Sequence, residues 1–214
     1  MQDIEDVVQN KYNAAKKPNN INNITKDLLT FTMIHRESSS LKKKFEKQFR
    51  TLAKKYKCQI KKSHLVSEYR RMQNEEGLPE DPVFLKLIQK KPVRNTSGVN
   101  PITLMYSPFP NGQAFTCRFK CKYCQTHPDF PKSYGPEAPA SSRGIQHDFD
   151  AIGQMNSNLK RLHENGHEVD KLEMNYEGGT FSEIPRNYIL DFHRDTYYAA
   201  NTFFDNDGEK RMPL

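Results

Sequence analysis

Apolar residues recur every three or four positions in the stretch that begins at residue 41. The stripe consists of Leu41, Phe45, Phe49, Leu52 and Tyr56. This spacing predicts an amphipathic α-helix, and Ser40 is a suitable N-cap for it. Shorter helices are predicted over residues 63–72 and 81–89. Residues 1–24 have few apolar positions and no period, so we expect a flexible segment over residues 1–40.

The pattern changes after residue 94. Residues 99–106 and 169–176 are predicted strands, and in the second of them Leu172, Met174 and Tyr176 alternate with polar residues. Helices are predicted over residues 148–165 and 185–204. Strands that alternate with helices indicate parallel βα units and therefore an α/β fold. A long loop rich in Pro and Gly follows the first strand, and such loops are typically functional.

Composition narrows the class of protein. Hydrophobic residues make up 35% of the 214 residues and charged residues 28%, which allows only a modest core. No apolar run reaches the ~18–20 residues that cross a bilayer, and residues 1–10 lack the basic and apolar regions of a signal peptide. We expect a soluble, intracellular protein with no membrane partner.

The net charge of +7 is concentrated in one segment. Residues 41–72 contain twelve Lys and Arg against two acidic residues, a surplus of +10. A solvated helix face is the plainer interpretation, but this surplus favours contact with RNA phosphates. The predicted RNA-binding residues are Lys42, Lys43, Lys44, Lys47, Arg50, Lys54, Lys55, Lys57, Lys61, Lys62, Arg70 and Arg71.

Three of the four cysteines lie close together in the long loop. Cys117, Cys121 and Cys124 follow a three-then-two spacing, whereas Cys58 stands apart. A tight group of thiols in a chain without an export signal favours metal over disulfides. Three thiolates predict a 4Fe-4S cluster with one open iron, which S-adenosylmethionine chelates. A Cys3His zinc site that includes His127 is the alternative.

Two further features favour the cluster over zinc. Tyr123 directly precedes the third cysteine, and its ring is suited to stack on the adenine of S-adenosylmethionine. Gly178, Gly179 and Thr180 follow the second predicted strand. Their bare backbone is suited to receive the amino group of the methionine part of the same cofactor.

Three stretches of the sequence resemble the family of the Elongator catalytic subunit, radical S-adenosylmethionine enzymes that modify wobble uridine (U34) in transfer RNA. The stretches are Lys91-Pro-Val-Arg-Asn-Thr-Ser-Gly98, Tyr123-Cys-Gln-Thr-His-Pro-Asp-Phe130 continuing to Arg143, and Gly166-His-Glu-Val-Asp-Lys-Leu-Glu173 leading into Gly178-Gly-Thr-Phe181. The last stretch is the most specific, because radical enzymes in general do not share it.

The resemblance implies a function and a division of the chain. It implies a 4Fe-4S cluster on the three cysteines, a reductant for it, and a radical that joins the acetyl carbon of acetyl-CoA to the uridine. It places acetyl-CoA at Lys171, which the strand pattern alone would leave as an exposed lysine. The expected divisions are a flexible segment 1–40, a small basic α-helical tRNA-binding domain 41–94, and an incomplete radical SAM (βα) barrel 95–214.

Other functions remain open on this sequence. Two βα units do not close a barrel, so we expect a fragment whose missing barrel and acetyltransferase portions lie on another chain. A zinc-stabilised RNA-binding protein without catalysis is one alternative. An inactive fragment that serves as an RNA-binding scaffold is the other.

Overall fold

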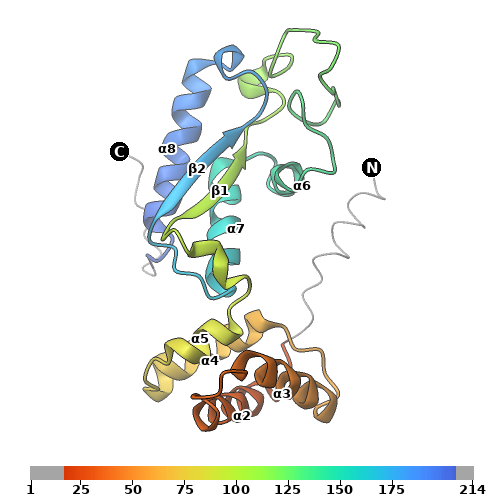
Figure 1. The fold of residues 1–214 in the computed structure, drawn as a ribbon. Coiled ribbons are helices and arrows are strands. Elements are labelled where there is room, and N and C mark those ends of the chain that lie inside the picture. The colour runs from red at the N-terminus through yellow and green to blue at the C-terminus, as the bar shows by residue number, and fades with distance from the viewer. Residues whose placement is uncertain (1–16, 206–214) are drawn as a thin grey trace. The chain divides into compact units, whose positions relative to one another are not determined.

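The computed structural model describes residues 17–205, which form two compact units. Within the described residues, the first unit comprises residues 17–97 together with 162–168, and the second comprises residues 98–161 and 169–205. Figure 1 shows helices alone at the start of the chain and a small sheet with its helices after it. The mixture of helices and a parallel sheet agrees with the predicted α/β class.

Four helices build the first unit, which we call the helical unit. They are α2 (Ile21–Ile34), α3 (Leu41–Lys55), α4 (Lys62–Glu76) and α5 (Pro82–Ile88), followed by the 3-10 turn η1 (Pro92–Asn95). Its buried core consists of Ile21, Ile24, Leu28, Phe45, Leu52, Ile60, Leu65, Val66, Tyr69, Phe84 and Ile88. The predicted stripe of α3 therefore faces a core, and its lysines lie outside it.

Helix α2 corrects one prediction. We expected residues 1–40 to be flexible, and residues 1–16 lie outside the described part of the chain, but residues 21–34 are helical. Ile21, Ile24 and Leu28 of α2 are buried against the other helices. These three residues are spaced three and four positions apart, so they lie on one face of the helix and pack against α3 and α4.

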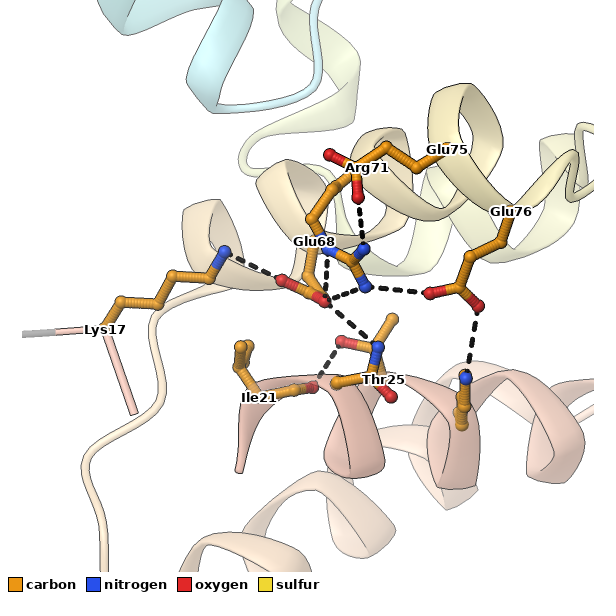
Figure 2. Close-up of polar contacts among 9 residues, drawn as sticks. Lys17, Ile21, Thr25, Glu68, Arg71, Glu75 and Glu76 are labelled. Atoms are coloured by element: carbon orange, nitrogen blue, oxygen red, sulfur yellow. Dashed lines mark hydrogen bonds and ion pairs between the residues drawn. The ribbon is translucent and has the colours of Figure 1, made fainter. Parts of the chain in front are cut away.

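A buried carboxylate joins α2 to α4. Glu68 of α4 is 3% exposed, and its oxygens accept hydrogen bonds from Asn22 (3.2 Å) and Arg71 (2.8 and 2.9 Å) and pair with Lys17 (2.7 Å). Figure 2 shows that Arg71 also reaches Glu75 and Glu76. Every charge in this cluster has an opposite charge beside it, which is what makes burial of Glu68 tolerable.

These contacts set the ionisation of Glu68. Burial by itself raises the pKa of this carboxyl, but the hydrogen bonds from Arg71, Lys17 and Asn22 outweigh burial and lower the pKa to about 2. The carboxylate is therefore charged at any pH where the protein is expected to work.

The second unit, the sheet unit, is built on two parallel strands. β1 (Asn100–Met105) pairs with β2 (Leu172–Glu177), with Asn100 opposite Leu172 and Met105 opposite Glu177. The helices are α6 (Pro139–Gln146), α7 (Ala151–Glu164) and α8 (Arg186–Thr202), with short 3-10 turns η2 (Pro110–Gly112) and η3 (Phe181–Glu183). The predicted parallel pairing is confirmed.

Helix α8 packs on the sheet through aromatic rings. The ring centroids of Tyr176 and His193 lie 4.0 Å apart. The hydroxyl of Tyr106 lies 2.7 Å from Nε2 of His193, and Phe192 packs edge-on against Tyr106. These contacts fix the carboxyl ends of both strands, where the loops that carry the candidate site begin.

At Met105, a side chain covers the outer edge of β1. Gln154 of α7 is fully buried; its Oε1 accepts from the backbone N–H of Met105, and its Nε2 donates to the carbonyl of the same residue, both at 2.9 Å. These two bonds replace those that a neighbouring strand would make with Met105. Among the described residues, β2 has no strand on its other side.

Candidate functional site

The two strands bring the cysteine loop and the second glycine turn to one edge of the sheet. The backbone N–H of Tyr106 donates to the carbonyl of Glu177 at 2.8 Å, which continues the ladder past β1. The loop that contains the cysteines starts there, and Gly178 and Gly179 directly follow β2. Loops at the carboxyl edge of parallel strands are where ligands bind in such folds.

A pocket of about 250 Å³ lies at this edge and is called the cysteine pocket below. Its lining residues are Cys117, Phe119, Cys121, Tyr123, Cys124, Lys132, Ser133, Tyr134, Gly179 and Thr180. All three predicted metal-binding cysteines therefore line one pocket with Tyr123, Gly179 and Thr180, although more than fifty positions separate the two groups in the chain.

The thiols of the pocket differ in exposure. Cys117 is 8% exposed, and its Sγ lies 3.2 Å from the hydroxyl of Thr180. The Sγ of Cys124 lies 2.9 Å from the hydroxyl of Ser133, and Cys121 is exposed. Both hydroxyls are able to donate to a thiolate, so the pocket suits sulfur in its metal-binding form.

The candidate donors for a metal centre at this edge are the three thiols. Within residues 17–205, no three His, Cys, Asp or Glu side chains are gathered closely enough to hold an ion. His127 does not line the pocket: its Nδ1 accepts from the backbone N–H of Asp129 at 3.3 Å, and its ring packs on Phe130. The three thiols are of the type that ligates iron–sulfur clusters and they line one pocket, so the 4Fe-4S cluster stays a prediction. A Cys3His zinc site is not favoured, because His127 lies outside this pocket.

Of the residues predicted to bind S-adenosylmethionine, Tyr123 lines the cysteine pocket and Gly178 does not. Tyr123 is 92% exposed, which leaves its ring face free for stacking, and a hydrogen bond with Cys121 raises its pKa. Gly178 has φ +151°, and a Cβ there would lie 2.9 Å from the Cβ of Tyr106. Gly178 is therefore required for the close approach of β2 to Tyr106.

Two titratable groups at this edge are partly buried. Burial raises the pKa of Glu177, and Arg143 offsets part of that effect. Burial also raises the pKa of Tyr134, with a contribution from the charge of Glu177. Both groups belong to the carboxyl edge of the sheet, and Tyr134 lines the cysteine pocket.

Lys132 is a pocket residue that the sequence did not single out. It is 9% exposed and donates from Nζ to the hydroxyl of Thr126. The run Pro131-Lys132-Ser133 contains nothing that distinguishes this lysine from the exposed lysines of the same loop, so the sequence gives no signal for its burial.

Lys171 lies away from the cysteine pocket. It directly precedes β2, and its carbonyl accepts from the N–H of Asn100 at 2.9 Å. Gly178 follows the other end of the same strand, and a strand of six residues is about 20 Å long. The contact of Lys171 with acetyl-CoA stays a prediction. If it forms, acetyl-CoA lies at the amino end of the strands, opposite to the cysteine pocket.

The predicted RNA-binding residues lie in the helical unit and differ in availability. Eight are exposed along α3 and the turn after it; these are Lys42, Lys43, Lys44, Lys47, Arg50, Lys54, Lys55 and Lys57. Lys61 is half-buried, and Lys62 donates to Glu46 at 2.9 Å and to the carbonyl of Leu87. Arg71 is engaged by three glutamates. Burial lowers the pKa of Arg70, which donates to the carbonyl of His163.

A groove of about 730 Å³ adds lysines to this surface. Residues at the start of α3, at the start of α4 and along α5 line this groove. Leu41, Val83 and Leu87 form its apolar part. The lysines that line it are Lys42, Lys62, Lys86, Lys90 and Lys91. Lys86, Lys90 and Lys91 were missed by the sequence analysis because residues 73–94 have no net charge.

Comparison with known proteins gives relatives but no family model, since none matches this chain. The chain is 38% identical over 112 residues to the tRNA uridine(34) acetyltransferase of Dehalococcoides mccartyi, a match that covers 52% of this chain and 23% of that protein. It is 30% identical over 155 residues to Elongator complex protein 3 of Schizosaccharomyces pombe, covering 68% and 28%.

A third relative is Elongator complex protein 3 of Homo sapiens, 28% identical over 130 residues, with 58% of this chain and 24% of that protein covered. The chain spans about a quarter of the length of these curated relatives. No helix in the described part of the chain is long and apolar enough to cross a membrane.

Proposed function

Because this chain is a relative of the Elongator catalytic family, we propose that it acts in the modification of uridine 34 of transfer RNA. The observation that carries the proposal is the cysteine pocket, in which three thiols meet the turn after β2. The names of the relatives indicate the proposed substrate, and the cysteine pocket is the proposed location of the reaction.

The cysteine pocket is proposed to hold a 4Fe-4S cluster through Cys117, Cys121 and Cys124. When bound with one open iron, such a cluster supplies the electron that cleaves S-adenosylmethionine. The chain's own residues bind S-adenosylmethionine and orient it. The backbone of Gly179 and the hydroxyl of Thr180 receive the amino group of the cofactor, and the exposed ring of Tyr123 stacks on its adenine.

The exposed lysines of α3 are proposed to bind the transfer RNA. They neutralise phosphates, so binding depends strongly on salt and little on sequence. Lys171 is proposed to contact acetyl-CoA. The acyl transfer itself is proposed for this chain together with the further length that its relatives have, and with a reductant for the cluster.

The first experiment is anaerobic reconstitution of the full chain with iron and sulfide. We expect about four iron and four sulfide per chain and a brown colour, as for a 4Fe-4S centre. With a chemical reductant, S-adenosylmethionine and transfer RNA, we then expect formation of 5′-deoxyadenosine. Cys58→Ala is the matched control and keeps the cluster, because Cys58 packs against the core of the helical unit.

A colourless protein that binds one zinc per chain would overturn the cluster. A cluster that forms but yields no 5′-deoxyadenosine would restrict the chain to an RNA-binding and cluster-binding role. Salt-independent binding of transfer RNA would remove the proposed role of the lysines.

A further inference from the structure

The cysteine pocket contains a buried positive charge that its cysteines do not explain. Lys132 lines the pocket and is 9% exposed. Lysine is among the residue types that are almost never buried unless an opposite charge lies beside them. The partners of its ammonium group therefore decide what the residue does.

The described protein gives this ammonium little compensation. Its Nζ donates to the hydroxyl of Thr126 and lies 5.9 Å from the ring centroid of Phe115. No carboxylate in residues 17–205 forms an ion pair with it. An ammonium has three donors, and one neutral hydroxyl neither uses them all nor neutralises the charge.

The lysine is held firmly beside the predicted cofactor-binding turn. Its backbone N–H donates to the hydroxyl of the fully buried Thr116 at 2.9 Å. Gly179 lies against both residues: a Cβ at Gly179, where φ is +92°, would approach the Thr116 hydroxyl to 3.1 Å and the Lys132 Cβ to 3.4 Å. The next residue, Thr180, contacts the thiol of Cys117. Cation, thiol and bare backbone thus belong to one pocket.

A purely structural role does not account for a charge at this position. The methylene groups of lysine fill space that methionine fills equally well, and a neutral side chain avoids the cost of desolvating an ammonium. The charge is useful only when something negative enters the pocket.

We propose that Lys132 makes the cysteine pocket an anion-binding site, in which its ammonium pairs with a negatively charged group of the occupant. Under the proposed function, on which the identity of the anion rests, two groups have this chemistry. One is the thiolate-ligated iron–sulfur cluster, and the other is the carboxylate of S-adenosylmethionine. Lys132 is a binding and positioning residue in either case.

Iron-free protein provides the first test, because it does not depend on the cluster. We compare the thermal unfolding of Lys132→Met with that of Lys122→Met, an exposed lysine of the same loop. If the buried charge is uncompensated, Lys132→Met raises the melting temperature of iron-free protein and Lys122→Met leaves it unchanged. A lower melting temperature for Lys132→Met would mean that Thr126 satisfies the lysine, and the proposal would be wrong.

Reconstituted protein then separates the two anions. If the cluster is the partner, Lys132→Met retains less iron and sulfide per chain and its cluster has a more negative reduction potential. If the cofactor carboxylate is the partner, iron content is unchanged and S-adenosylmethionine binds at least tenfold more weakly, while decarboxylated S-adenosylmethionine binds as it does to the wild type. Lys132→Arg restores either property at least in part.

Failure of this inference is distinct from failure of the proposed function. A wild-type chain that assembles no cluster contradicts the proposed function, and the iron-free comparison still decides whether Lys132 is an uncompensated charge. A wild type that assembles the cluster and binds S-adenosylmethionine, with Lys132→Met and Lys122→Met alike in every measurement, overturns the role of Lys132 alone.

Discussion

Among the Lys, Arg, Asp and Glu side chains of residues 17–205, each unit buries one, and the two charges have opposite surroundings. In the helical unit, Glu68 has Lys17, Asn22 and Arg71 around it, so the carboxylate is neutralised and most of its acceptor sites are filled (Figure 2). In the sheet unit, Lys132 has one hydroxyl.

The difference separates structure from binding. When all partners of a buried charge come from the same unit, the charge holds helices together. It is then already compensated and has no reason to pair with a ligand. A buried charge with incomplete partners at a pocket costs stability in the empty protein and becomes favourable when an anion arrives. Changes that act on one unit should therefore leave the other intact.

The largest effect is expected from Cys121→Ala. This variant should lose essentially all of its reconstituted iron, because two thiolates do not hold a 4Fe-4S cluster, whereas its affinity for transfer RNA should stay within about twofold since the lysines of α3 are untouched. Iron analysis and a filter-binding assay measure the two properties. Equal loss of both would contradict the independence of the units.

Glu68→Ala should destabilise the helical unit by about 2–3 kcal/mol, because Arg71 and Lys17 lose their buried partner and the space is left empty. Urea unfolding followed by circular dichroism measures the loss. Glu75→Ala is the control: it removes a largely exposed partner of the same arginine and should cost under about 1 kcal/mol. Equal effects of the two variants would show that burial of Glu68 is unimportant.

Gln154→Leu should destabilise the sheet unit by about 2 kcal/mol, because the buried N–H and carbonyl of Met105 both lose their partner. Asn156→Leu is made on the exposed face of the same helix and should have little effect. Thermal unfolding compares the two. A neutral Gln154→Leu would mean that water reaches this edge and replaces the amide.

Acid should weaken the helical unit through Glu68. Its pKa is lowered to about 2 in the folded protein, from 4.5, so its contribution to stability is fully present above about pH 4.5 and is lost as the pH falls toward 2. We expect a loss of about 3 kcal/mol over that range, measured by urea unfolding at several pH values. In Glu68→Gln this part of the pH dependence should vanish; a variant with the wild-type slope would assign it to other carboxyls.

The smallest effect is expected on RNA. Replacing Lys43, Lys47 and Lys54 by Gln should weaken transfer RNA binding about tenfold and reduce the slope of log K against log salt by about two to three. The same three lysines changed to Arg keep the charge and should keep both values. An unchanged slope in the Gln variant would place the RNA on another surface.

The sequence predicted those elements whose apolar residues are periodic. The stripe of α3 and the alternation in β2 read directly as a helix and a strand, and the parallel pairing followed from their order. Helix α2 was missed although Ile21, Ile24 and Leu28 follow a helical spacing, because the prediction treated residues 1–40 as one segment and took its character from the polar residues at the start. Ser40 precedes α3 as expected, yet its side chain makes no capping bond. Helix α6 was missed inside the long loop.

The sequence allowed prediction of the cysteines and of the glycine turn of the candidate site, but not of the other residues that line the pocket. The cysteine spacing and the glycine turn identified most of the cysteine pocket, because chain order places both after parallel strands. Burial of Lys132 depends on its contacts with Thr116 and Gly179. Thr116 lies well before it in the chain and Gly179 well after it, so the local sequence does not indicate the burial. Glu75, four residues after Arg71, already indicated an ion pair within the helix. The net charge of residues 41–72 does not show this pair, because it sums all charges of the segment and Glu75 lies beyond it.

Gln154 has a consequence for how this sheet is able to grow. Exposed strand edges invite pairing with any other extended chain, and proteins protect them for that reason. Because the amide of Gln154 occupies the outward N–H and carbonyl of Met105, a strand from a second copy would have to displace this side chain before it could pair along the full length of β1. Within residues 17–205, β2 has no strand on its outer side, so an added strand would meet no such side chain-to-backbone bond to displace there.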